Sequence, residues 1–212
     1  MFVKKWIVLI LTVCPLNSAA EIYINTSDLA LKASLHNLSA TGQLNTPIST
    51  YPLLWGDIKT ALNKIDVEQL PTSAKNAYFH VQAEYSKSQS QNITISANGA
   101  KNKLRFTSFG DSFRNKNNIT LSMSGQNANF AYKIVPSITS HEFDGDQVQW
   151  NDSYLAAKVG NWYVSFGTQD RWWGPGWDTN MGLSNNARPI PAFALTRNKS
   201  TPFSLPFIDH KI

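Results

Sequence analysis

The stretch most able to carry chemistry lies late in the chain, where residues 170–178 read DRWWGPGWD. This tryptophan loop holds three of the chain's seven tryptophans, with two aspartates and an arginine. Exposed indole rings stack on the apolar face of a sugar, while carboxylate, amide and guanidinium groups hydrogen-bond its hydroxyls. Gly174 and Gly176 allow a tight turn and Pro175 stiffens it. One interpretation is therefore a rigid saccharide-binding platform.

Packing is the second interpretation, because a loop at the end of a strand can fold inward and plug the lumen of a barrel. In that case the tryptophans would be packing groups and the neighbouring charges would form a buried ladder. In the saccharide-binding interpretation, Arg171, Arg188 and Arg197 would pair bidentately with the carboxylate of a uronic acid. The residues that either role would use are Arg171, Trp172, Trp173, Trp177, Asp178, Asn185, Asn186 and Arg188.

A catalytic role is the weakest interpretation. Asp170 and Asp178 supply two carboxylates, as glycoside hydrolysis requires, but a pair within one loop has no fixed separation. The chain contains no nucleophile elbow, HExxH motif or phosphate-binding loop. His36 and His80 show no metal-ligand spacing. We therefore expect no catalytic residue, no metal and no cofactor.

The N-terminus predicts export. Lys4 and Lys5 precede an apolar run over residues 6–13, and Ser18-Ala19-Ala20 resembles a signal-peptidase site. Residues 1–20 are therefore predicted to be a signal peptide, because eight apolar residues are too few to span a bilayer. Cleavage would remove the single cysteine, so an exported chain would fold without a disulfide.

Composition narrows the class further. The formal net charge is +5, and loss of the signal peptide would lower it by two. No basic run or basic helical face is present, so a nucleic-acid partner is not expected. Beyond the leader no long apolar segment occurs, which excludes a helical membrane protein. A transmembrane β-barrel remains possible, because its strands show only alternating apolarity.

Residues 21–89 carry helical patterns that we interpret as a small bundle. The first helix is predicted over residues 27–42, with Ser27 as N-cap and Gly42 as the stop. A second is predicted over residues 50–66 with Pro52 in its first turn, and a third begins at Pro71. Their core positions are predicted to be Leu31, Leu35, Leu38, Ile58, Leu62, Ile65, Ala74, Tyr78, Val81 and Tyr85.

After residue 90 the apolar period changes to two, which predicts three consecutive β-hairpins. The first would pair residues 93–97 with 104–108 across Asn98-Gly99. The second would pair residues 119–123 with 130–134. The third would pair residues 155–159 with 162–166 across Gly160-Asn161.

This alternation fits either a soluble sheet with one wet face or a membrane barrel with an apolar outside. Strands of about seven to ten residues approach the length that crosses a bilayer at a tilt. Short turns also alternate with a longer polar link over residues 139–152. Both features favour the barrel.

Two segments carry a resemblance to a known family. The stretch GTQDRWWGPGWDTNMGLSNNARPIPAFALTRN resembles the signature region of the capsule assembly Wzi family, and TYPLLWGDI is similar to its N-terminal part. The resemblance implies an outer-membrane β-barrel with a helical region on the periplasmic side. It also implies a lectin-like protein that retains capsular polysaccharide at the cell surface, and not an enzyme.

Together these expectations describe a mainly β protein with a small N-terminal α region. Residues 21–89 would form a periplasmic helical bundle, and residues 90–212 the first strands of an antiparallel outer-membrane barrel that includes the tryptophan loop. Relatives are more than twice as long, so the barrel would be incomplete in this chain. The expected partners are capsular polysaccharide and outer-membrane lipid. A porin or sugar-transporting barrel and a secreted glycan-cleaving enzyme are the rival functions.

Overall fold

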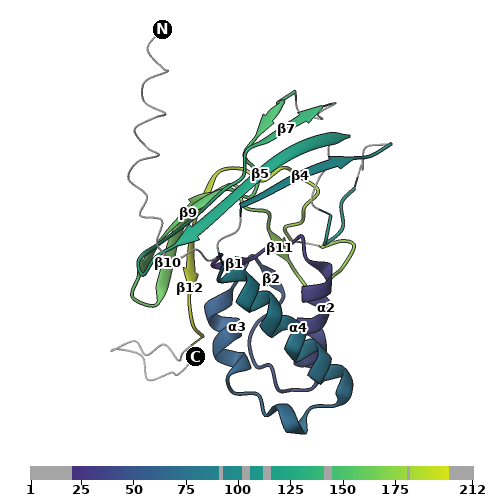
Figure 1. Cartoon of the computed structure of the whole chain (residues 1–212), viewed down its shortest axis with the longest axis vertical. Helices are drawn as coiled ribbons and strands as arrows, with labels where there is room; N and C mark the ends of the chain where they lie inside the picture. The colour runs from purple at the N-terminus through teal and green to yellow at the C-terminus, as the bar shows by residue number, and fades with distance from the viewer. Residues whose placement is uncertain are drawn as a thin grey trace.

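A computed structural model describes residues 21–90, 93–101, 106–111, 116–140, 145–180 and 182–200. The predicted signal peptide, residues 1–20, lies outside the described residues. Figure 1 shows a twisted sheet lying above a group of helices, with the chain passing from helices to strands. The architecture is mainly β with a few helices, as the sequence predicts.

Among the described residues, three α-helices form the helical part: α2 (Leu29–Ala40), α3 (Trp55–Leu62) and α4 (Thr72–Ser88), with a 3₁₀ helix η1 (Val67–Gln69) between the last two. The cap of α2 is Asp28 and not Ser27, because the Asp28 carboxylate accepts the Leu31 N–H at 2.8 Å. Gly42 follows the helix with a φ of +73°, as a helix stop requires.

The predicted helical turn at Pro52 is wrong. Residues around it form two short strands, β2 (Thr50–Tyr51) and β3 (Leu53–Leu54), and α3 starts only at Trp55. β3 pairs with β1 (Tyr23–Ile24), and β2 pairs with part of the tryptophan loop. These long-range pairings outweigh the local preference of proline for a first helical turn.

The main core lies between the helices. The predicted stripes meet there, with Leu35, Leu38, Ala74 and Val81 fully buried. Trp172 from the tryptophan loop belongs to the same cluster. A second, smaller cluster joins the N-terminal segment to the sheet through Ile22, Tyr23, Leu54, Ala131, Tyr154 and Ala156.

Eight strands form the main sheet in the order β12-β10-β9-β6-β5-β7-β8, and β4 pairs with β5 on its other edge. They are β4 (Ile93–Gly99), β5 (Asn117–Gln126), β6 (Phe130–Ile134), β7 (Ser137–Ser140), β8 (Val148–Gln149), β9 (Tyr154–Val159), β10 (Trp162–Gly167) and β12 (Ala192–Arg197). All pairings are antiparallel. Within the described ranges the sheet is open, since β4 and β12 do not pair with each other.

Two strand positions are interrupted. β6 and β7 pair with β5 in one continuous register, and Pro136, which has no N–H, separates them. β8 and β9 pair with β7 and β6, but one extra residue shifts the register between them, as in a β-bulge. The sheet is therefore an up-and-down meander. In it, β6 and β7 lie end to end beside β5, and β8 and β9 lie end to end beside them.

The first predicted hairpin is wrong, the second is confirmed in part, and the third is confirmed. β4 runs through Asn98 and Gly99 and pairs with β5, with Ile93 opposite Met123 and Gly99 opposite Asn117. The ten-residue β5 offers a longer alternating partner than residues 104–108, of which Leu104 lies outside the described residues. The β9–β10 hairpin forms as predicted. The β5–β6 hairpin forms with its turn after Gln126, so that only Met123 of residues 119–123 pairs with β6, while Ile119 pairs with β7. The link over residues 139–152 contains β8.

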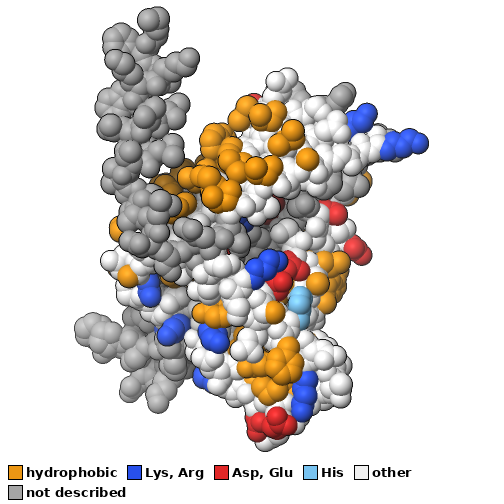
Figure 2. Space-filling model, in the orientation of Figure 1, with side chains coloured by type: hydrophobic (Ala, Val, Ile, Leu, Met, Phe, Trp, Pro, Cys, Tyr) orange, Lys and Arg blue, Asp and Glu red, His pale blue; other side chains and the backbone are white. Residues whose placement is uncertain are grey.

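The two faces of the sheet differ sharply. One face, called here the apolar outer face, carries large side chains that point to solvent, and Figure 2 shows hydrophobic side chains gathered over the sheet. Its exposed members are Ile93, Ile95, Ile119, Phe130, Ile138, Val148, Leu155, Val159, Val164, Phe166, Phe193 and Leu195. The opposite face holds small or polar groups such as Ala131, Lys133 and Ser165. In the part of the chain that the structure describes, no helix has the length and apolarity to cross a membrane.

Candidate functional site

The tryptophan loop is fastened to the helical part of the protein. Within it, β11 (Trp172–Trp173) pairs with β2, placing Trp172 opposite Tyr51. The Gly174 N–H donates to the Ser49 carbonyl at 2.8 Å, and the Trp173 N–H donates to the Leu183 carbonyl at 2.9 Å. The loop therefore has a fixed backbone that leads back beneath the sheet toward the helices (Figure 1).

Trp172 has no exposed surface. Its ring packs edge-on against Phe109, with the centroids 5.7 Å apart at 90°, and its indole N–H donates to the Gly176 carbonyl at 2.9 Å. A side chain buried in this way does not reach a ligand. Of the two roles considered from the sequence, the geometry of Trp172 favours packing.

Lys32, a residue that the sequence analysis did not single out, lies at the centre of the loop's attachment. It projects from α2, is fully buried, and its ammonium donates to the Gly176 carbonyl at 2.6 Å. Four aromatic rings surround it, with Nζ-to-centroid distances of 4.0 Å to Phe109, 4.7 Å to Trp177, 5.3 Å to Trp172 and 5.9 Å to Tyr51. We call this group the lysine cage. The faces of these rings attract the cation.

Burial shifts the pKa values of titratable groups in and beside the lysine cage. It lowers the pKa of Lys32 from 10.5 to about 8. Burial also lowers the pKa of the His36 imidazole, and the nearby Lys32 charge lowers it further. The pKa of the Tyr51 hydroxyl rises, first through burial and then through the Asp28 carboxylate. No sequence signal marked Lys32, since it directly follows Leu31 and lies beside the predicted apolar stripe, not on it.

The exposed part of the loop is aromatic and acidic. Trp173 is 50% exposed and Trp177 is 38% exposed, while the Asp178 side chain also faces solvent. Leu183, whose carbonyl is bonded to Trp173, is 42% exposed beside them. Trp177 also contacts the His36 ring at 5.3 Å between centroids. Two indole faces and a carboxylate are thus held at the surface of one rigid turn.

The remaining candidate residues connect this region to other loops. The Asn186 side-chain oxygen accepts the Thr107 N–H at 2.8 Å, and Asn185 is 1% exposed. The Arg188 guanidinium donates to Asp146 at 2.8 Å and to the Asn151 side-chain oxygen at 3.2 Å. Arg171 is half-buried. The geometry favours a structural part for Asn185 and Arg188. Trp173, Trp177 and Asp178 are exposed, and Asn186 is also exposed, although its side-chain oxygen is hydrogen-bonded to Thr107.

A separate charged group ties the N-terminal segment to the inner face of the sheet. Lys133 on β6 is nearly buried and pairs with Glu21 and with Asp152, the latter at 2.5 Å. The Asn25 amide donates to the same two carboxylates, at 3.3 Å and 3.0 Å. Because the Lys133 ammonium is shared by the Glu21 and Asp152 carboxylates, every charge in the cluster has a partner of opposite sign. The cluster therefore has a structural role, which is to join the N-terminal segment to the sheet.

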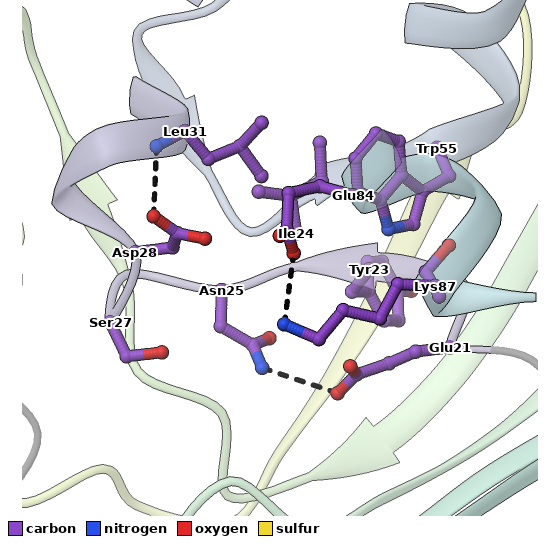
Figure 3. Close-up of a pocket in the computed structure, with 11 residues that line it drawn as sticks. Glu21, Tyr23, Ile24, Asn25, Ser27, Asp28, Leu31, Trp55, Glu84 and Lys87 are labelled. Atoms are coloured by element: carbon purple, nitrogen blue, oxygen red, sulfur yellow. Dashed lines mark hydrogen bonds and ion pairs between the residues drawn. The ribbon is translucent and has the colours of Figure 1, made fainter. Parts of the chain in front are cut away.

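One pocket lies at this junction, with a cavity volume of about 150 Å³. Figure 3 shows Trp55 at its wall and the carboxylates of Glu21, Asp28 and Glu84 around it. Asp28 caps α2, and Glu84 pairs with Lys87 at 3.3 Å. Ligand pockets usually have volumes of about 300–1,000 Å³. This cavity is smaller, and its charged groups already bond within the protein, so it is not the candidate site.

No group of three or more His, Cys, Asp or Glu side chains suited to a metal ion occurs among the described residues. Asp170 and Asp178 lie on either side of the fixed turn, and Asp170 is half-buried while Asp178 is exposed. The arrangement is suited to non-covalent contact with a ligand.

The fold of the chain is similar to that of a solved structure. The chain is similar to an outer membrane protein of Escherichia coli, Wzi, whose solved structure is described as a carbohydrate-binding β-barrel involved in group 1 capsule assembly. The TM-score is 0.71 at 21% identity, over 88% of this chain and 42% of that one. An uncharacterized 55.8 kDa protein from the cps region of Klebsiella pneumoniae is 24% identical over 84% of this chain and 35% of its own length.

The chain thus spans less than half the length of either relative. The family model described as capsule assembly protein Wzi matches residues 86–210, which is more than half of the chain and includes the sheet and the tryptophan loop. The chain belongs to the Wzi capsule assembly family.

Proposed function

We propose that this chain is part of an outer-membrane protein that retains capsular polysaccharide at the cell surface without covalent chemistry. Membership of the Wzi family gives it a role in capsule assembly. The observation that carries the membrane location is the apolar outer face. Soluble proteins rarely expose contiguous apolar patches above a few hundred Å², whereas a barrel strand presents this pattern to lipid.

The connections of the sheet support an orientation. The short turns between β5 and β6 and between β9 and β10 lie at one end, and α3 contacts this end where the Ser200 N–H donates to Asp57 at 2.8 Å. The long connections leave from the other end, and the tryptophan loop folds back from there beneath the sheet to β2 and α2 of the helical part (Figure 1). Short turns face the periplasm in outer-membrane barrels. We therefore place residues 21–89 on the periplasmic side, and residues from about 90 onward in the first barrel strands.

An open strand edge in lipid leaves amides unpaired, which costs several kcal/mol per group. We therefore propose that further strands, as in the longer relatives, close the sheet. The inner face supports retention over conduction, because Tyr23 and Glu21 from the N-terminal segment pack against Ser165 and Lys133. A lumen filled in this way would pass few ions.

Saccharide contact is assigned to Trp173, Trp177 and Asp178. Their exposure and the fixed turn between them provide two stacking faces and a hydrogen-bond acceptor at low entropic cost. Contact with each repeat of a polymer would be weak, but many repeats held by neighbouring copies would add through multivalency.

Binding of immobilised group 1 capsular polysaccharide from E. coli by the detergent-purified chain tests this function. The unchanged chain should bind in a dose-dependent way, and Trp173→Ala with Trp177→Ala should weaken binding at least tenfold, while Phe79→Ala, an exposed aromatic on α4, should not. Release of reducing ends from the polysaccharide would instead support the rival function of a glycan-cleaving enzyme. Conductance in planar bilayers with no polysaccharide binding would support the porin.

A further inference from the structure

A buried lysine that no catalytic step uses calls for a reason. Moving an ammonium out of water costs several kcal/mol even after the protein relaxes. A methionine of similar length would fill the same apolar space without that cost. Lys32 is fully buried among four rings, so packing alone does not explain why a charged side chain occupies this position.

The hydrogen bond of Lys32 and two of its four ring contacts are with the tryptophan loop, which carries the exposed tryptophans. The Gly176 carbonyl accepts two hydrogen bonds, one from Lys32 at 2.6 Å and one from the Trp172 indole at 2.9 Å. The next residue, Trp177, places its ring 4.7 Å from the same ammonium. Lys32 therefore fixes both the direction of the Gly176 peptide and the orientation of the Trp177 ring.

The turn itself depends on such a fixed geometry. Gly174 has a φ of +144°, and a Cβ at Gly176 would lie 2.1 Å from the Thr179 carbonyl oxygen. A turn with two glycines has many conformations when it is free. The two bonds to the Gly176 carbonyl select one of them, with Trp173 and Trp177 on either side.

We propose that Lys32 is a positioning residue, which holds Trp177 and the Gly174–Gly176 turn in the single arrangement that presents the two exposed indoles to a saccharide. The saccharide ligand in this inference rests on the proposed function. The positioning of Trp177 and the turn by Lys32 does not depend on it. Lys32 acts through Trp177 and Gly176, since a fully buried ammonium touches no external ligand.

The test combines a ligand-independent and a ligand-dependent measurement on the full chain. The chain is labelled with 5-fluorotryptophan, and the Trp173 and Trp177 signals are assigned with Trp173→Phe and Trp177→Phe. Lys32→Met should shift or split the Trp177 signal by more than its linewidth and weaken group 1 polysaccharide binding at least fivefold. The melting temperature should not fall. Lys64→Met, which replaces an exposed lysine after α3, is the matched control and should change none of these.

The outcomes separate the two ideas. An unchanged Trp177 signal in folded Lys32→Met contradicts the positioning role, whatever happens to binding. A changed signal in a chain that never binds polysaccharide upholds positioning and removes the proposed function. If Lys32→Met does not fold, Lys32→Gln is measured in its place against Lys64→Gln. An unchanged Trp177 signal in folded Lys32→Gln overturns the role, and a shifted or split signal supports it.

Discussion

The Trp172 ring lies edge-on to the Phe109 ring, with centroids 5.7 Å apart, and Trp172 is opposite Tyr51 in the β11–β2 pairing. These contacts join three segments that are distant in the sequence. They make the tryptophan loop a part of the helical core as well as a connection between strands.

Substitution of Trp172 should therefore destabilise the protein more than substitution of its neighbour. Trp172→Ala removes a fully buried indole and should lower the free energy of unfolding by about 3–5 kcal/mol. Trp173→Ala, at a half-exposed position, should cost less than about 1 kcal/mol. Urea unfolding in detergent micelles measures both. Equal losses for the two variants would show that Trp172 is not a core residue.

Stability should also depend on pH through the lysine cage. Lys32 has a pKa of about 8 in the fold and 10.5 when unfolded, so the unfolded chain binds more protons between these values. Stability should therefore rise as the pH increases from about 8, by no more than about 3 kcal/mol in total. The raised pKa of Tyr51 acts in the opposite sense above about pH 10, and the lowered pKa of His36 keeps that group neutral throughout.

The comparison that isolates this effect is the unfolding free energy of the unchanged chain against Lys32→Met at pH 7.5 and 9.5. Because Asp28, His36 and Tyr51 are present in both, their contributions cancel to first order. From pH 7.5 to pH 9.5, the free energy of unfolding of the unchanged chain should rise relative to that of Lys32→Met. A difference that is constant with pH would mean that burial does not perturb Lys32.

Loss of Lys133 should loosen the N-terminal segment from the sheet. Lys133→Met leaves the Glu21 and Asp152 carboxylates without their shared cation, and breaking a nearly buried pair of this kind costs about 3 kcal/mol or more. Lys158→Met, at an exposed position on β9, is the control and should cost under about 0.5 kcal/mol. Proteolysis near Glu21 should become faster in Lys133→Met only. Resistance equal to that of the control would rule out the fastening role.

The two faces of β12 offer a matched test of membrane contact. Leu195 is on the apolar outer face, and Thr196, the next residue, is on the inner face opposite Tyr163. Leu195→Arg should reduce recovery in the outer membrane, because arginine at the lipid face costs about 2–4 kcal/mol near the midplane. Thr196→Arg should reduce it less. The reverse order would mean that the outer face does not meet lipid.

The strands were predictable where one face alternates over a full hairpin. Residues 155–166 pair as expected because the period of two and the Gly160-Asn161 turn specify the same register. The turn predicted at Asn98-Gly99 is wrong for a physical reason. A turn-forming pair of residues also fits within a strand when a longer partner strand such as β5 is available. The helical turn predicted at Pro52 is wrong because strand pairing with residues far along the chain decides its local structure.

The site was only partly predictable. The composition of residues 170–178 located the loop, but the division into buried Trp172 and exposed Trp173 depends on its pairing with Thr50 and Tyr51. Lys32 was beyond reach for the same reason. A lysine on a helix is ordinarily a solvated group, and only the arrival of four rings from three other segments makes it the centre of the cage.

The central claim is that the apolar outer face lies against outer-membrane lipid, and cell fractionation tests it most directly. The chain with its N-terminal segment would be expressed beside a full-length relative, and the outer-membrane fraction run unboiled and boiled on a denaturing gel. The account predicts that the chain is recovered in that fraction, and that a band whose mobility changes on heating appears where strands close into a barrel. Recovery of folded chain in the soluble periplasmic fraction, with the relative inserted normally, would contradict it.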